Sequence, residues 1–177
     1  MRVPTLSCVG GWNRRLTVKL NDVNIEERAT FYFSNRYHCS QAVLLAVQEL
    51  MGRRDEDAVR MMSGFGGGFG GAGSVCGAIS GGVAALGLAY GRGKLEERDA
   101  PRLFPLCAEL YRRFGEEIET SCFCRDITGV DFGTMEGVKA FYGSPEKLAR
   151  CARLVAKTAE MVRDMLVREE EKPRTDS

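Results

Sequence analysis

MMSGFGGGFGGAGSVCGAISGG, residues 61–82, is a glycine-rich stretch that leads directly into a single cysteine and an apolar run. Seven of the ten residues from Gly64 to Gly73 are glycine, and Cys76 follows. No charged residue occurs from Met61 to Gly91. Because glycine allows positive φ and close approach to the main chain, the stretch predicts a tight loop before a buried helix.

The apolar run after the loop is too short to cross a membrane. Its helical part, residues 75–90, spans ~24 Å at ~1.5 Å per residue, whereas a bilayer core is ~30 Å thick. The spacing of Gly77 and Gly81 does match a contact motif of membrane helices. We nevertheless expect no membrane span, and instead a central helix that is buried on all sides.

Composition indicates one globular domain in a chain of 177 residues. Lys and Arg number 25 against 24 Asp and Glu, so no net field would attract nucleic acid. The amino terminus lacks an apolar core of signal-peptide length, and we therefore expect a cytoplasmic protein. Since disulfides are rare in that compartment, the seven cysteines are better interpreted as ligands or redox groups, although some could simply pack in the core.

Helical periodicity dominates from residue 25 to residue 167, and no convincing pair of strands is present. The predicted fold is therefore all-α, a compact multi-helix bundle with the glycine-rich loop before its buried central helix. Residues 1–24 form an N-terminal extension with a weak strand pattern at 16–20, and residues 168–177 form a frayed tail. The expected helices cover residues 25–34, 37–51, 55–62, 75–90, 99–120, a short segment between Ser121 and Gly129, 134–142, and a last helix starting at Ser144-Pro145.

Three cysteines are predicted in the first turns of helices, where amides and the helix dipole stabilise a thiolate. They are Cys39, Cys76 with Ser74 as the N-cap, and Cys124 with Ser121 as the cap. Cys151 falls one turn further into the last helix, on its inward stripe. Cys107 lies mid-helix on an apolar stripe and is predicted to pack in the core, and Cys8 has no informative context.

Two other kinds of site are disfavoured. The glycines match the dinucleotide pattern G-x-G-x-x-G, but the preceding segment is helical and charged rather than a buried strand. The only histidine, His38, excludes a Rieske centre, and no Cys-x-x-Cys-His for covalent haem is present. We interpret His38 as a polar residue at a helix start.

Several short segments together resemble the C_GCAxxG_C_C family, which is described as redox-active. The resemblance covers about residues 25–167, and a similar domain occurs in split-Soret cytochrome c, where it is associated with an iron–sulfur site. The haem-binding part of that cytochrome has no counterpart here. The segments are YHCSQAV (37–43), GFGGG (64–68), CGA (76–78) followed by Gly81, LGL (86–88), CRDITG (124–129) and the late Cys151.

The resemblance implies that Cys39, Cys76, Cys124 and Cys151 are the redox-active residues or cluster ligands. Cys122 is an alternative third ligand, and Val75 meets the family's second motif only loosely. The glycines would let the main chain approach a cluster, so that backbone amides could donate hydrogen bonds to its sulfur atoms. Alternatively, they would simply allow a tight helix crossing, and the two roles are compatible. These backbone positions are Gly66, Gly67, Gly68, Gly70, Gly71 and Gly77.

Four cysteines from four helices would suit an iron–sulfur cluster, with [2Fe–2S] favoured and electron transfer as its role. Zinc is less favoured, because no chelating Cys-x-x-Cys pair occurs. The alternatives are a metal-free thiol–disulfide protein that uses two of these cysteines, and a non-catalytic helical interaction module. We expect an electron carrier or oxidoreductase component acting with a redox partner protein. The small-residue face of residues 75–90 would suit a homodimer as well as the core.

Overall fold

The computed structural model describes residues 22–171, which form a bundle of eight α-helices and confirm the predicted all-α fold. Within these residues there is no β-strand, and a single isolated bridge joins Val75 and Phe123. The predicted strand at 16–20 and Cys8 lie outside the described residues. The elements are α1 (Ile25–Ser34), α2 (Cys39–Leu50), α3 (Glu56–Met61), a 3₁₀ turn (Met62–Phe65), α4 (Gly77–Tyr90), α5 (Leu103–Arg113), a π turn (Phe114–Ile118), α6 (Cys124–Thr128), α7 (Met135–Tyr142) and α8 (Pro145–Glu171).

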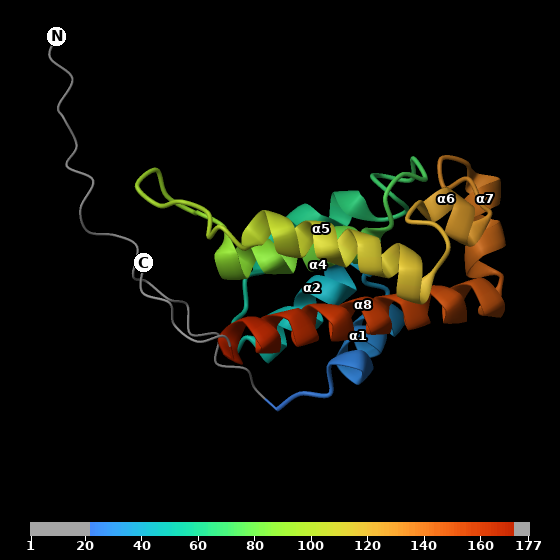
Figure 1. Ribbon diagram of the computed structural model, residues 1–177. Helices are drawn as coiled ribbons and strands as arrows, with labels where there is room; N and C mark the ends of the chain where they lie inside the picture. Colours follow the sequence, from blue (N-terminus) through green and yellow to red (C-terminus); the bar gives the residue numbers. More distant parts are fainter. Residues whose placement is uncertain (1–21, 172–177) are drawn as a thin grey trace, which may run out of the picture.

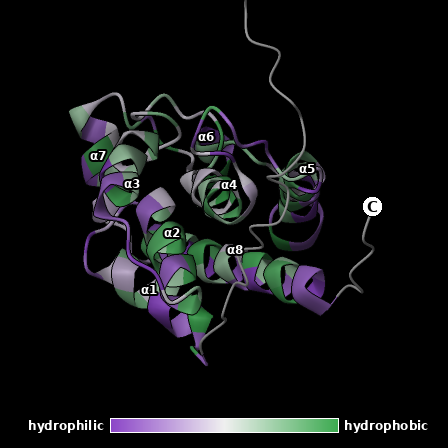
Figure 2. Cartoon of the chain, turned by 90° about the vertical axis from the view of Figure 1, so that its left-hand side faces the viewer, coloured by the Kyte–Doolittle hydropathy of each residue, from purple (hydrophilic) through white to green (hydrophobic). Residues whose placement is uncertain are grey.

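The central helix is α2, which lies between α1, α4 and α8 (Figure 2). Every residue of α2 except Cys39 and Glu49 is buried. Its buried polar side chains are satisfied by the neighbouring segment: Ser40 Oγ donates to the Met62 carbonyl at 2.7 Å, and the Gln41 amide donates to the Val59 carbonyl at 3.1 Å. The hydrogen bonds and the apolar packing together fix α2 against the start of the glycine-rich loop.

Our prediction that the helix after the glycines is buried on all sides is wrong. Within residues 22–171, helix α4 packs against α2, α5, α8 and the 3₁₀ turn, but its outer side is not fully covered, since Val83 is 37% exposed. Its predicted small-residue face does allow a close crossing, because a Cβ on Gly81 would collide with the Ser40 carbonyl oxygen of α2. The helix also begins two residues later than predicted, with Cys76 rather than Ser74 as its N-cap.

The glycine-rich loop, α6 and α7 lie together at one end of the bundle, where α8 begins (right-hand side of Figure 1). Gly129 ends α6 with a positive φ of 64°, as predicted, but the predicted cap Ser121 is wrong, because the N-cap of α6 is Phe123. Thr134 Oγ1 caps α7 by accepting the Gly137 amide at 3.0 Å. Helix α6 begins only at Cys124, so Cys122 precedes it. This end of the molecule therefore gathers the segments that carry most of the predicted site.

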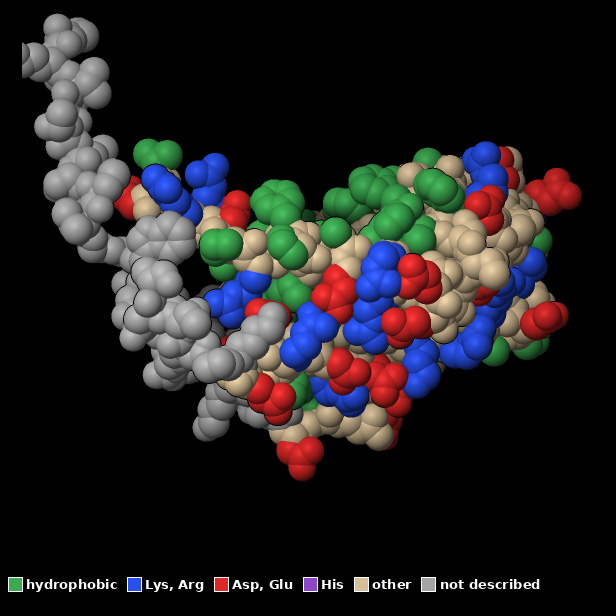
Figure 3. Space-filling view, in the orientation of Figure 1, with side chains coloured by type: hydrophobic (Ala, Val, Ile, Leu, Met, Phe, Trp, Pro, Cys, Tyr) green, Lys and Arg blue, Asp and Glu red, His purple; other side chains and the backbone are tan. Residues whose placement is uncertain are grey.

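Helices α5 and α8 close the bundle along its length. The predicted helix 99–120 is divided into α5 and the π turn that follows it, and α8 continues to Glu171, past the predicted start of a frayed tail. Arg168 of α8 pairs with Glu109 of α5 at 2.7 Å. Figure 3 shows acidic and basic side chains alternating across the front, with hydrophobic ones gathered along the upper edge over α5. No helix within residues 22–171 is long and apolar enough to cross a membrane.

Candidate functional site: four converging cysteines

The fold brings together four cysteines that are far apart in the sequence. Cys39 is the first residue of α2, Cys76 is the N-cap of α4, Cys124 is the first residue of α6, and Cys151 lies in the second turn of α8. Cys76, Cys124 and Cys151 are at most 8% exposed, and Cys39 is partly buried. A charge on Cys151 would raise the pKa of each of the other three thiols, so all four share one electrostatic environment.

Backbone hydrogen bonds hold Cys76 and Cys124 beside each other. The Cys76 amide donates to the Cys122 carbonyl at 2.8 Å, and the Cys124 amide donates to the Ser74 carbonyl at 2.7 Å. The amide of Ser74 in turn donates to the Gly68 carbonyl at 3.1 Å. These bonds explain why Ser74 is not a helix cap: its carbonyl and amide already connect the glycine-rich loop to the segment before α6.

Two of the six predicted backbone glycines contact the cysteines. A Cβ on Gly68 would lie 2.9 Å from Cys124 Cβ, and one on Gly77 would lie 3.3 Å from Cys39 Cβ. Gly68 also has a positive φ of 72°. A side chain at either position would therefore enter the space between the loop and the site.

The other four predicted glycines shape the loop instead of contacting a cysteine. The Gly66 amide donates to the Ser63 carbonyl at 3.3 Å and the Gly71 amide to the Gly66 carbonyl at 3.2 Å. A Cβ at Gly66 would meet the His38 ring, those at Gly67 and Gly71 would meet Phe132, and Gly70 is almost open. Hence the amides of Gly66 and Gly71 are used within the loop.

The thiols of Cys107 and Cys122 lie apart from the thiols of these four. The Cys122 thiol donates to the Tyr111 carbonyl of α5 at 3.5 Å and lies beside Gly115. Cys107 is partly buried and packs against the apolar core, as its position on an apolar stripe predicts. Of the two candidates for the third position, the fold thus brings Cys124, and not Cys122, to the other three cysteines.

Most of the chain matches a known protein family. The family model described as "Putative redox-active protein (C_GCAxxG_C_C)" matches residues 37–165. The chain belongs to the C_GCAxxG_C_C family. The match includes all four converging cysteines and begins after α1. No curated protein and no solved structure matches the chain.

Burial is the main cause of a raised pKa for two thiols of this C_GCAxxG_C_C protein, Cys76 and Cys124. It raises the pKa of Cys76 to about 12 and that of Cys124 to about 11. The amides of Ala78 and Ile79 act on Cys76 in the opposite direction but do not outweigh burial. Our expectation that first-turn positions lower the thiol pKa is therefore wrong for these residues. Burial destabilises their thiolates more than the helix amides stabilise them.

Cys151 is the exception, because its pKa is lowered. The main cause is a hydrogen bond with the Cys39 thiol, which raises the pKa of Cys39, and the cations of Arg150 and Lys147 add to it. Sequence reasoning missed both cations, although Lys147 stands four residues before Cys151 on one helix and therefore on the same face. The Cys39–Cys151 pair is therefore the part of the reduced site that most readily holds a negative charge.

The thiols do not surround a single point. Among residues 22–171, no three His, Cys, Asp or Glu side chains are arranged to hold one metal ion. Ligands of an iron–sulfur cluster bind different iron atoms and need not meet at one point. His38, the N-cap residue of α2, is exposed, and its amide donates to Gln41 Oε1 at 3.1 Å, which fits its predicted place at a helix start.

Proposed function

We propose that this protein carries single electrons by means of an iron–sulfur cluster, [2Fe–2S] in the first instance, held by Cys39, Cys76, Cys124 and Cys151. The observation that carries the proposal is the convergence of four thiols, three of them buried and one partly buried, from four separate elements. Thiols that served only as small apolar side chains would be dispersed through the core. Cys107 is an example, because it packs against the apolar core on its own. A non-catalytic interaction module would have no need of the convergence.

The surrounding residues suit a group that is anionic and needs protection from water. The four sulfur atoms would be the ligands, and the bound cluster would supply reversible one-electron chemistry. The amides of Ala78 and Ile79 are directed at the Cys76 sulfur, and hydrogen bonds of this kind set the potential of such centres. Gly68 and Gly77 leave the space beside Cys124 and Cys39 free of side chains.

The donor or acceptor would be a redox partner protein, and the setting a reducing compartment such as the cytoplasm. All six cysteines within residues 22–171 are free thiols, which fits that environment.

A second candidate function is favoured by the contact between Cys39 and Cys151. Cys39 donates a hydrogen bond to Cys151, which has the lowered pKa that an attacking thiolate needs. A low-molecular-weight disulfide could accept two electrons and two protons from this pair, leaving a Cys39–Cys151 disulfide and two small thiols. Two cysteines would suffice for this activity, whereas a cluster needs all four.

The first prediction separates these functions by cysteine replacement. Iron and acid-labile sulfide are measured in protein purified without oxygen, for the wild type and for Ser variants of Cys39, Cys76, Cys124 and Cys151. We expect stoichiometric iron and sulfide in the wild type and severalfold less in each variant, because each removes a ligand. C107S and C122S serve as controls and should retain wild-type iron, since these thiols lie elsewhere.

A different pattern of iron content and thiol oxidation would exclude the cluster. If the wild type holds no iron after reconstitution, and only C39S and C151S lose one reversibly oxidised thiol pair, the cluster is excluded and the disulfide function replaces it.

A further inference from the structure

We propose that Lys147 is a positioning residue of the four-cysteine site, and that its ammonium raises the reduction potential by stabilising the reduced state. The inference rests on the proposed redox function, but it does not depend on which redox centre the cysteines form.

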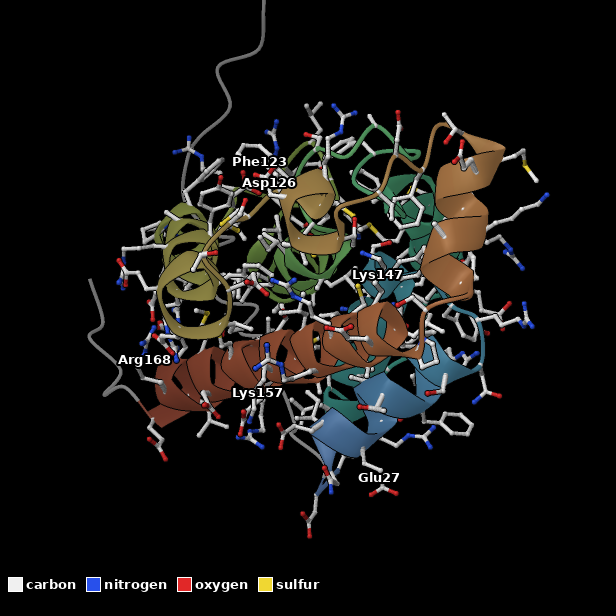
Figure 4. All side chains as sticks on the ribbon, turned by 90° about the vertical axis from the view of Figure 1, so that its right-hand side faces the viewer. Glu27, Phe123, Asp126, Lys147, Lys157 and Arg168 are labelled. Carbon is white, nitrogen blue, oxygen red and sulfur yellow. The ribbon has the colours of Figure 1, made fainter. Side chains whose placement is uncertain are left out.

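The Lys147 ammonium lies between two of the helices that carry the cysteines. Lys147 stands one turn before Cys151 on α8, so the two side chains share a face. Its Nζ donates to the Thr128 carbonyl at 2.5 Å, and Thr128 is the last residue of the short helix that begins with Cys124. Figure 4 shows Lys147 between α6 and α8. The ammonium thus links the helix carrying Cys151 to the helix carrying Cys124.

The charge of Lys147 is less neutralised by carboxylates than that of its neighbour Arg150. Lys147 is partly buried, and its hydrogen-bond partner Thr128 contributes a neutral carbonyl. In the part of the chain that the structure describes, no carboxylate forms an ion pair with Lys147. The cation of Arg150, the neighbour of Cys151 in sequence, also lowers the Cys151 pKa, but it pairs with Glu119 at 2.7 Å, and Glu119 acts on Cys151 in the opposite direction. The charge of Lys147 is therefore not offset by an ion pair and can stabilise the nearby thiolates.

The direction of the effect follows from electrostatics. Reduction of a cluster adds one electron from the donor, and the site becomes more negative by one charge. Reduction of a disulfide takes two electrons, breaks the S–S bond and leaves thiols or thiolates. In both cases a nearby cation, poorly screened because the site is buried, favours the reduced state. Removal of the cation should therefore lower the potential whichever centre is present.

The test compares the midpoint potentials of the wild type, K147Q, K147R and K157Q. Gln keeps an N–H donor for the Thr128 carbonyl but removes the charge, and Arg keeps both. Lys157 lies on the same helix, where it pairs with Glu26 and Glu160, and is the control for loss of a surface cation. We expect K147Q to lower the equilibrium constant for one-electron reduction about tenfold, or ~59 mV, with K147R and K157Q close to the wild type.

Two results would overturn the proposal. Equal potentials for K147Q and K157Q would show that the ammonium does not act on the site. Equal shifts in K147Q and K147R would show that shape, not charge, matters. Iron content is measured on the same samples, and a site without iron is titrated against a glutathione buffer. An iron-free site with a lowered K147Q potential would reject the cluster while leaving the role of Lys147 intact.

Discussion

At the scale of single residues, Gly68 shows how the glycine-rich loop can lie against the cysteines. Its φ is 72°, and a Cβ there would lie 2.6 Å from the Ser74 carbonyl oxygen as well as close to Cys124. Gly70 has a similar φ of 63°, but its nearest neighbour would be 3.9 Å away. Substitutions at these two glycines therefore distinguish the energetic effect of the left-handed backbone conformation from that of a steric clash.

Replacement of these glycines by alanine gives a prediction at this scale. G70A should lower the free energy of unfolding by about 1 kcal/mol, the cost of a left-handed conformation. G68A should lose on the order of 1–3 kcal/mol more, because the methyl group must displace Ser74 or Cys124. Urea denaturation of the two variants measures the difference. Equal losses in G68A and G70A would mean that the loop does not lie against Cys124 as described.

Residue identities at the site could be predicted from the sequence, but their acidity could not. The motif segments indicate Cys39, Cys76, Cys124 and Cys151, and the structure brings these four together. Their pKa values depend on burial and on Arg150 and Lys147, and burial results from tertiary packing that a first-turn position does not reveal.

At the scale of helices, periodicity predicted where helices occur better than where they begin. The predicted segments around α2, α4 and α7 contain those helices, whereas α8 continues beyond its predicted segment to Glu171. The start of α4 was missed because Ser74 is bound to Gly68 and Cys124, which are distant in sequence. The exposure of Val83 was missed because hydrophobicity predicts that a helix is covered, but not on which side.

The crossing of α2 and α4 yields a prediction within one helix. G81A should destabilise the protein by about 3 kcal/mol, since the methyl group would force the two helices apart at Ser40. G87A should stabilise it by about 0.5–1 kcal/mol, because nothing lies within 4 Å of a Cβ at that position and alanine favours the helix. Thermal or urea unfolding tests both. A G81A variant as stable as G87A would contradict the close crossing.

At the scale of the whole molecule, the bundle connects four distant points of the chain at one end. No spacing between the four cysteines has the short interval of a chelating pair, so local geometry could not predict their meeting. The meeting depends on the packing of α2 against α4 and α8, and on the hydrogen bonds that bring the segment before α6 to the glycine-rich loop. The fold as a whole, not any one motif, assembles the site.

The most direct test of the central claim is the visible absorption spectrum of the wild-type protein, purified without oxygen and recorded before and after dithionite. A thiolate-bound cluster predicts visible absorption that bleaches as the centre takes up one electron. A colourless protein that remains colourless after reconstitution with iron and sulfide would contradict the account.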